Sequence, residues 1–172
     1  MVRWDDIASR TSRANRVVVA QPLGADTLGH RRRRAGSQAH RVRLTGMTPE
    51  QTVDEFIRRV LADDLDGACE LASEDIEYDN VPVGKNVGHQ AMKDFLSVMA
   101  TMGEVTFEIH RQVAVGRTVM NERTDRFDLG DRQIDLPVAG VFELDGEGRI
   151  CLWRDYFDYA TFERQLAPPA PD

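Results

Sequence analysis

The sequence has few cysteines and no long apolar segment. Its 172 residues include only Cys69 and Cys151, which are not joined by a C-x-x-C spacing. This usage favours two reduced, small core side chains over a disulfide or a metal site. No stretch approaches the ~18 consecutive apolar residues of a transmembrane helix, and no early apolar run has the length of a signal-peptide core. The sequence therefore predicts a cytoplasmic protein with no membrane partner.

Several well-known catalytic motifs are also missing. The chain has no G-x-S-x-G nucleophile elbow of the covalent hydrolases and no H-E-x-x-H zinc motif. The segment "DGEGRI" (145–150) lacks the third glycine of a dinucleotide-binding loop. The four histidines have no metal-ligand spacing: His30, His40, His89 and His110. Any catalytic site in this chain must therefore be built from residues other than these known motifs.

Charge divides the chain at residue 47. Residues 1–46 hold ten arginines against three aspartates, a net charge of +7, whereas residues 47–172 hold 12 basic and 26 acidic side chains, a net charge of −14. The first part contains "HRRRRAGSQAHRVR" and has no sustained apolar period, so we predict a disordered Arg-rich extension. A translation start at Met47 is the alternative explanation of this segment. Arginine runs can neutralise phosphates, but no aromatic platform accompanies them and the body is acidic, so no nucleic-acid partner is expected.

One ordered domain is predicted over 47–166, followed by a Pro-rich tail over 167–172. Thr48 can cap a helix, Gln51 completes a capping box, and Pro49 suits the first helical position. The residues that follow have the i, i+3, i+4 pattern of a helix with one buried face. Two further helices are expected, over 65–72 and 90–101.

Period-two patterns dominate the remainder of the domain. We expect a short strand at 75–80, a loop at 81–89, and four long strands at 105–115, 118–128, 133–144 and 149–157, separated by glycine-containing turns. Helices followed by a meander of strands favour an α+β fold. The prediction is a curved, mixed but mainly antiparallel sheet that forms a cone, with the N-terminal helices packed on its concave face around a pocket.

An aspartate interrupts the apolar face of the last strand. In "ICLWRDYFDY" (150–159), alternation places Asp155 on the same face as Cys151, Trp153 and Phe157. Burying an unpaired carboxylate is unfavourable. Asp155 therefore requires either a partner or a function.

A partner for Asp155 is available on another strand. In "TVMNERTDRFD" (118–128), the apolar residues at the two ends indicate an inward face that also carries Arg123 and Asp125. A guanidinium can bind two carboxylates through bidentate hydrogen bonds. An isolated R-x-D would instead be interpreted as an exposed surface ion pair. With the strand at 75–80, five polar side chains are predicted to converge inside the cone: Tyr78, Asn80, Arg123, Asp125 and Asp155.

Such a group can supply both an acid and a base. Burial raises the pKa of a carboxyl group and a neighbouring cation lowers it, so two carboxylates beside one guanidinium can differ in protonation. A phenol and an amide are suited to hold a neutral water. Activation of that water by one carboxylate, with a proton from the other for a strained oxygen leaving group, would hydrolyse an epoxide in one step to a vicinal diol.

Three motifs carry a family resemblance. The segments "EYDN" (77–80), "ERTD" (122–125) and "WRDYFD" (153–158) resemble, in order and separation, the limonene-1,2-epoxide hydrolase family over about 47–166. The resemblance implies the cystatin-like curved sheet of the nuclear-transport-factor-2-like superfamily, a homodimer, and no metal or organic cofactor. It also implies residue roles: Asp155 as the base, Asp125 as the acid, Arg123 as the bridge between them, and Tyr78 and Asn80 as residues that help to hold the water.

The predicted pocket lining is apolar and compatible with a lipophilic epoxide as the partner, a cyclic terpene-like one included: Met92, Leu96, Leu136, Val138, Phe142 and Phe157. Two alternatives remain. A ketosteroid isomerase-like or polyketide cyclase-like enzyme on the same fold would use a Tyr and an Asp, but would leave Arg123 between two carboxylates without a role. A non-catalytic small-molecule-binding module is the other, because a fold alone does not determine function.

Overall fold

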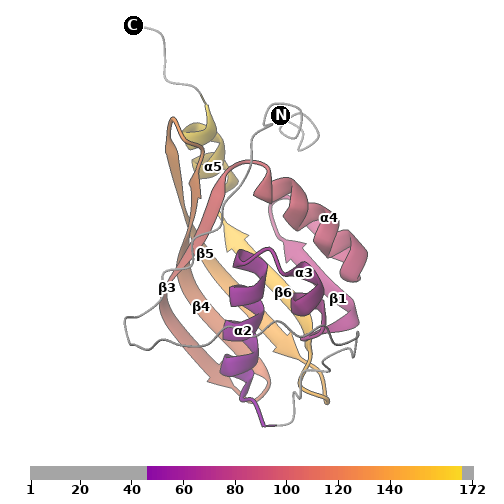
Figure 1. Ribbon diagram of the computed structural model, residues 1–172. Helices are drawn as coiled ribbons and strands as arrows, with labels where there is room; N and C mark the ends of the chain where they lie inside the picture. The colour runs from indigo at the N-terminus through magenta and orange to yellow at the C-terminus, as the bar shows by residue number, and fades with distance from the viewer. Residues whose placement is uncertain (1–45, 168–172) are drawn as a thin grey trace, which may run out of the picture.

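A curved six-stranded sheet wraps around helices in this computed structural model, which describes residues 46–167 (Figure 1). The predictions for the Arg-rich extension and the Pro-rich tail concern residues that lie almost entirely outside this range. The helices are α2 (Pro49–Leu61), α3 (Leu65–Cys69), α4 (His89–Ala100) and α5 (Tyr159–Leu166). The strands are β1 (Ala72–Asn80), β2 (Gly84–Val87), β3 (Glu104–Val115), β4 (Thr118–Asp128), β5 (Gln133–Leu144) and β6 (Ile150–Phe157).

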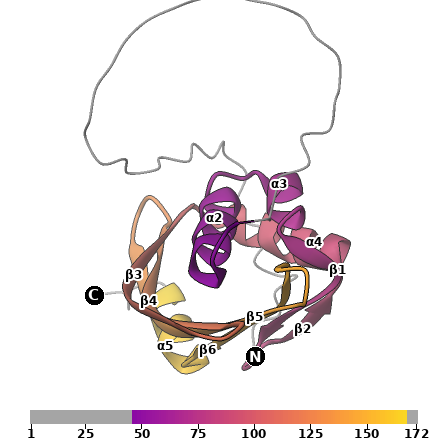
Figure 2. The ribbon, with the colours of Figure 1, turned by 90° about the horizontal axis from the view of Figure 1, so that it is seen from below.

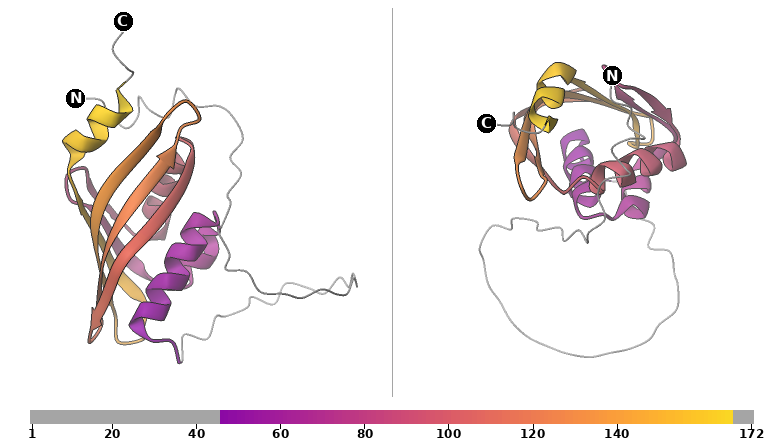
Figure 3. Two further views of the ribbon diagram at one scale, coloured as in Figure 1. Left: turned by 90° about the vertical axis from the view of Figure 1, so that its left-hand side faces the viewer. Right: turned by 90° about the horizontal axis from the view of Figure 1, so that it is seen from above.

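The sheet is mixed and strongly curved, as predicted. Its strand order is β2-β1-β6-β5-β4-β3, and only the β1–β6 pair is parallel among the strand pairs of the described chain. Seen along the strands, the sheet is an open arc with α2, α3 and α4 on its concave side (Figure 2). The side view shows α5 at the end of the sheet where β6 finishes (Figure 3). This α+β architecture confirms the predicted fold class.

Helix α2 anchors the concave layer above the site. Its predicted capping box is present, because Thr48 Oγ1 accepts a hydrogen bond from the Gln51 backbone at 3.3 Å and the Gln51 side chain accepts one from the Thr48 backbone at 2.9 Å. The buried face of the helix includes Phe56, whose ring meets Trp153 edge-on with centroids 5.4 Å apart. The helix therefore packs directly on the residue two positions before Asp155.

The apolar core is divided into two clusters. The larger lies beneath α2, α3 and α4 and includes Val119 at the start of β4. The smaller joins the far end of β4, through Phe127, to Phe162 of α5. Along β4 the inward-facing polar residues Asn121, Arg123 and Asp125 therefore lie between two apolar layers that limit their access to water.

Some local predictions were wrong. The predicted loop at 81–89 contains β2, a short edge strand that pairs with β1. Helix α3 ends at Cys69 because the chain enters β1 at Ala72. Cys151 does not share the buried stripe of β6: the β5–β6 register shifts beside it, so Ile150 is buried and Cys151 is only half-buried. Helix α5 was not predicted.

None of the helices in residues 46–167 is long and apolar enough to cross a membrane.

Candidate active site

Strand register brings the predicted polar residues together. Asp155 on β6 pairs with Asn80 on β1 and with Gly140 on β5, and Gly140 pairs in turn with Asn121 on β4. Arg123 lies two residues beyond Asn121 on the same inner face of β4. Residues of four adjacent strands, β1, β6, β5 and β4, therefore lie side by side on the concave face.

Arg123 bridges the two aspartates. Its Nε and Nη2 donate to Asp125 Oδ1 and Oδ2 at 2.6 and 3.1 Å, and its Nη2 also donates to Asp155 Oδ2 at 2.8 Å. The residues are 1%, 5% and 3% exposed for Arg123, Asp125 and Asp155. The interpretation as an exposed surface ion pair is therefore wrong for this R-x-D segment. The attraction within a buried ion pair repays the desolvation of its charges only when further hydrogen bonds satisfy the remaining polar atoms. The groups around these three residues therefore determine whether the ion pair is stabilising.

The charge balance of this buried group determines its protonation. One guanidinium beside two ionised carboxylates would leave a net negative charge away from water, which is unfavourable. Burial, together with the charge of Asp155, raises the pKa of Asp125 to about 6 against the lowering effect of Arg123. Burial would lower the pKa of Arg123, but the two carboxylates outweigh it and raise that pKa above its ordinary value. Arg123 therefore stays charged, whereas Asp125 can carry a proton near neutral pH.

Tyr78 and Asn80 present polar atoms to the same pocket. The Tyr78 hydroxyl donates a long contact to Met99 Sδ at 3.9 Å. Burial first, and then the Asp155 carboxylate, raises the pKa of Tyr78, so its hydroxyl keeps its proton. The Nδ2 of buried Asn80 makes no hydrogen bond of good geometry among the described residues, although the Asn80 side chain lies close enough to the Tyr78 oxygen to lower the pKa of that hydroxyl slightly. Such a donor is unfavourable to bury unless a bound molecule satisfies it.

The pocket beside these groups is small. Its volume is about 20 Å³, which is room for about one water molecule. Its lining combines the polar groups with apolar side chains from α4, α5 and four strands: Tyr78, Asn80, Phe95, Met99, Phe107, Asp125, Phe127, Leu136, Asp155, Phe157 and Phe162.

The predicted apolar lining is divided between three places. Leu136 and Phe157 line the pocket, and Leu96 lines a neighbouring groove. The structure places Met92, Val138 and Phe142 in the buried core, outside the linings of both cavities. Stacking explains the position of Phe142, whose ring lies parallel to that of Trp153 with centroids 5.8 Å apart.

Three residues of the site were not identified from the sequence. Trp153 Nε1 donates to Asp155 Oδ1 at 2.9 Å, and Asn121 Oδ1 accepts from Arg123 Nη1 at 3.1 Å. A Cβ atom on Gly140 would lie 2.3 Å from Arg123 Nη1, so only glycine leaves room for the guanidinium. A glycine inside a strand pattern is a known sign of close approach. That sign was available at Gly140, but it does not identify the group that approaches.

Asn121 also connects the site to α2. Its Nδ2 donates to Gln112 Oε1 at 3.3 Å, and Gln112 Nε2 donates to Asp54 Oδ1 at 2.8 Å. This series of contacts holds the amide of Asn121 with its oxygen toward Arg123. The guanidinium is thus oriented from three sides, by two carboxylates and an amide.

Other titratable groups lie outside the site. His110 is exposed on β3, where its Nε2 is 2.9 Å from Thr124 Oγ1. Arg154, on the outer face, donates to Asp79 at 2.8 Å. Within residues 46–167, no group of three or more His, Cys, Asp or Glu side chains could hold a metal ion.

Comparisons with known proteins agree with this geometry. The family described as "Limonene-1,2-epoxide hydrolase catalytic domain" matches residues 47–167. Epoxide hydrolase EphG of Mycobacterium tuberculosis (strain ATCC 25618 / H37Rv) is 39% identical over 117 residues, which are 66% of this chain and 76% of that protein.

Solved structures share the fold. An LEH-like (limonene epoxide hydrolase-like) epoxide hydrolase from M. tuberculosis is 34% identical with a TM-score of 0.60, covering 69% of this chain and 89% of its own. A SnoaL-like polyketide cyclase, so described, from Shewanella putrefaciens CN-32 has a TM-score of 0.61 at 20% identity, covering 70% and 97% of the two chains, and shows likeness of fold alone. By its match over 47–167 and its identity to EphG, the chain belongs to the limonene-1,2-epoxide hydrolase family.

Proposed function

We propose that this protein adds water to a lipophilic epoxide in a single step and releases a vicinal diol, without a metal or organic cofactor. The observation that carries the proposal is the bridge that buried Arg123 forms between Asp125 and Asp155. Family membership and the relative named as an epoxide hydrolase support the reaction class. The apolar residues around the bridge support a lipophilic substrate.

Asp155 is the proposed general base. Its two oxygens already accept hydrogen bonds from Trp153 and Arg123, which fix the carboxylate in the lining of the catalytic pocket. A water in the small pocket would accept a hydrogen bond from the unpartnered Nδ2 of Asn80, with the hydroxyl of Tyr78 nearby. Asp155 then removes a proton from this water as its oxygen bonds to an epoxide carbon.

Asp125 is the proposed general acid. With a pKa of about 6, it is half protonated near pH 6 and keeps its proton in roughly a tenth of the molecules at pH 7. It donates this proton to the epoxide oxygen as the carbon–oxygen bond breaks, so the product is a neutral diol. Asp155 gains the proton that the water loses and Asp125 loses the one that the oxygen gains. The net charge around Arg123 therefore stays constant, which avoids creating a buried charge during the reaction.

The decisive experiment is a screen of the purified protein against lipophilic epoxides, followed by a single turnover in ¹⁸O-labelled water. The one-step mechanism predicts that the label enters the diol directly. Label in Asp125 or Asp155 would instead indicate an ester intermediate and overturn the one-step mechanism. If no epoxide were hydrolysed, the isomerase, cyclase and binding-module alternatives would replace this proposal.

A further inference from the structure

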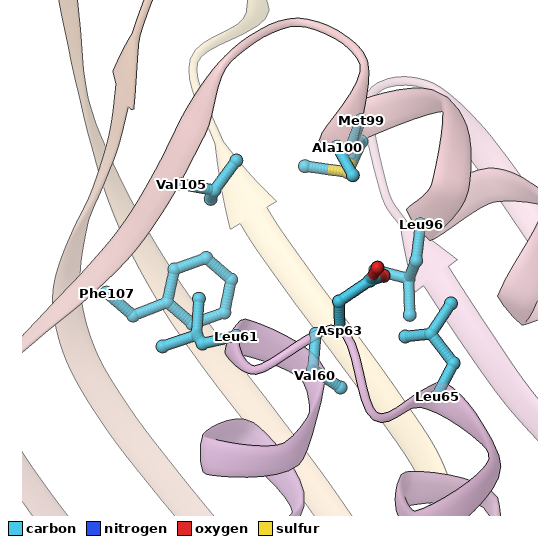
Figure 4. Close-up of a pocket in the computed structure, with 9 residues that line it drawn as sticks. All are labelled: Val60, Leu61, Asp63, Leu65, Leu96, Met99, Ala100, Val105 and Phe107. Atoms are coloured by element: carbon cyan, nitrogen blue, oxygen red, sulfur yellow. The ribbon is translucent and has the colours of Figure 1, made fainter. Parts of the chain in front are cut away.

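A second apolar opening adjoins the catalytic pocket (Figure 4). This outer groove lies between the C-terminal end of α2, helix α4 and the start of β3, and its volume is about 110 Å³. It is lined by Val60, Leu61, Asp63, Leu65, Leu96, Met99, Ala100, Val105 and Phe107. Met99 and Phe107 also line the catalytic pocket, so these two side chains are shared by both cavities.

The volumes require a substrate to occupy more than the catalytic pocket. Space of about 20 Å³ accepts a water but not a lipophilic epoxide, and ligand pockets are usually about 300–1,000 Å³. The outer groove is the larger of the two cavities and shares a boundary with the catalytic pocket. An epoxide ring that reaches Asp155 can therefore leave the remainder of its molecule in the outer groove.

The shared boundary has one fixed and one adaptable side chain. The ring of Phe107 lies 4.7 Å from the guanidinium carbon of Arg123, a cation–π contact that holds the ring in place. The Met99 side chain makes a long contact of 3.9 Å with the Tyr78 hydroxyl, and methionine is flexible enough to repack around a ligand. Movement of Met99 would join the two cavities.

The mouth of the outer groove carries a negative charge. Asp63 is exposed, has a positive φ of 58°, and projects its carboxylate across the opening toward Leu96 (Figure 4). No hydrogen bond or ion pair of this carboxylate is found among residues 46–167. Asp64 follows directly in the sequence and caps α3, and Asp66 two residues later is paired with Lys93 at 2.9 Å, so Asp63 carries the charge at the opening. An anionic end group would meet this charge at low ionic strength.

We propose that the substrate is a neutral epoxide with an extended apolar arm, whose ring enters the catalytic pocket while the arm occupies the outer groove past a displaced Met99. This inference rests on the proposed epoxide hydrolysis and adds the substrate class. Asp63 selects against substrates whose arm ends in a carboxylate.

A matched set of 1,2-epoxides tests the length and the charge of the arm. kcat/KM should rise about fourfold for each added methylene until the groove is filled. An epoxide whose arm ends in a carboxylate should be about two- to fivefold poorer than its methyl ester at low salt, a difference that added salt removes. Asp63→Asn should abolish the difference, and asparagine tolerates the left-handed backbone at this position.

A variant that fills the outer groove tests the location of the arm. Ala100 lines the groove but not the catalytic pocket, so Ala100→Phe should lower the ratio of kcat/KM between long and short epoxides about tenfold or more, through KM. The matched control is Ser97→Phe, which places the same side chain at an exposed position on the same helix. It should leave that ratio unchanged.

Binding of the product diols, measured by calorimetry, separates the two proposals. If short epoxides are hydrolysed but neither arm length nor Ala100→Phe changes the selectivity, the outer groove does not hold the arm and this inference is overturned, while the proposed reaction survives. If no epoxide reacts but a long-arm diol binds in a manner sensitive to Ala100→Phe, the groove stands and the reaction fails. If no epoxide reacts and no long-arm diol binds, both the proposed reaction and the outer-groove inference are overturned.

Discussion

The indole Nε1 of Trp153 donates a hydrogen bond to Oδ1 of Asp155 over 2.9 Å, and both side chains are buried. Because Arg123 donates to the other oxygen at 2.8 Å, the Asp155 carboxylate is held at both ends. If Asp155 is the base, as we propose, a carboxylate fixed in this way does not have to reorganise when substrate arrives, which is a major contribution to catalysis in low-dielectric sites.

Trp153→Phe removes this donor and keeps an aromatic ring that can stack on Tyr78. We expect kcat to fall about 10- to 100-fold, because a hydrogen bond to a charged group contributes roughly 1.5–3 kcal/mol. Steady-state kinetics and thermal midpoints should be compared with Phe142→Leu, which disturbs the same stack without contacting Asp155. If Trp153→Phe kept the wild-type kcat, the indole would have no orienting role.

Gly140→Ala should disable the site with little change in the rest of the sheet. The added Cβ would lie 2.3 Å from Arg123 Nη1 and 2.6 Å from Asn121 Oδ1, so the guanidinium must shift. We expect kcat to fall at least about 100-fold, because misplacing a catalytic group by about 1 Å can have that effect. Ala139→Val is the control, since Ala139 is exposed on the opposite face. Equal activity of both variants would contradict the crowding argument.

The two motifs on β4 and β6 show what the sequence could predict. Strict alternation puts Arg123, Asp125 and Asp155 on one face, because the strand period of two applies whatever the partner strands are. The role of Gly140 could not be predicted, because it depends on the register between β4, β5 and β6. Cys151 was misplaced for a related reason: the register shift beside Glu143 moves one residue out of the alternation.

The pocket lining was harder to predict than the polar site. Phe142 and Val138 alternate correctly on β5 and are buried, yet neighbouring side chains cover them, so an inward direction did not mean contact with the pocket. Phe162 lines the pocket from α5, a helix that was not expected after the last strand. Cavities depend on how distant elements pack, which local periodicity does not report.

The pH dependence should reveal the proton on Asp125. If Asp125 is the acid, kcat/KM should decline as pH rises through about 6, because the group then loses the proton that it must donate. Asp125→Asn should have greatly reduced activity without this descending limb. A wild-type profile that stays flat from pH 5 to pH 8 would contradict the assignment.

The same group should influence stability in a defined direction. The pKa of Asp125 is raised from 3.8 to about 6 by folding, so the folded state binds the proton more tightly than the unfolded state. Its contribution is complete below about pH 3.8 and is lost as pH rises through about 6. The free energy of unfolding of the wild type, relative to that of Asp125→Asn, should therefore decrease from pH 4 to pH 7 in urea titrations. An increase would reverse the inferred sign.

We expect a homodimer, as the family resemblance implies. The outer face of the sheet carries exposed apolar side chains that include the cross-strand pair Val113 and Met120, which are 60% and 49% exposed. Burying such a patch favours association. Light scattering after size exclusion should give the mass of two chains, and Met120→Arg should shift it toward one, unlike Ser97→Arg on α4. A wild-type monomer at all concentrations would refute the expectation.

The central claim, that Asp155 is the base, is tested most directly by kcat measured together with the thermal midpoint of Asp155→Asn. Asparagine keeps the shape of the side chain but cannot accept the proton, so we predict that hydrolysis falls about 10²- to 10⁴-fold. The variant should melt near the wild-type temperature, because Asp125, freed of the neighbouring negative charge that raises its pKa, ionises and balances Arg123 alone. If Asp155 only balances the charge of Arg123, the variant should instead lose about 3–5 kcal/mol of stability. A folded Asp155→Asn protein that hydrolyses its epoxide at the wild-type rate would contradict the account.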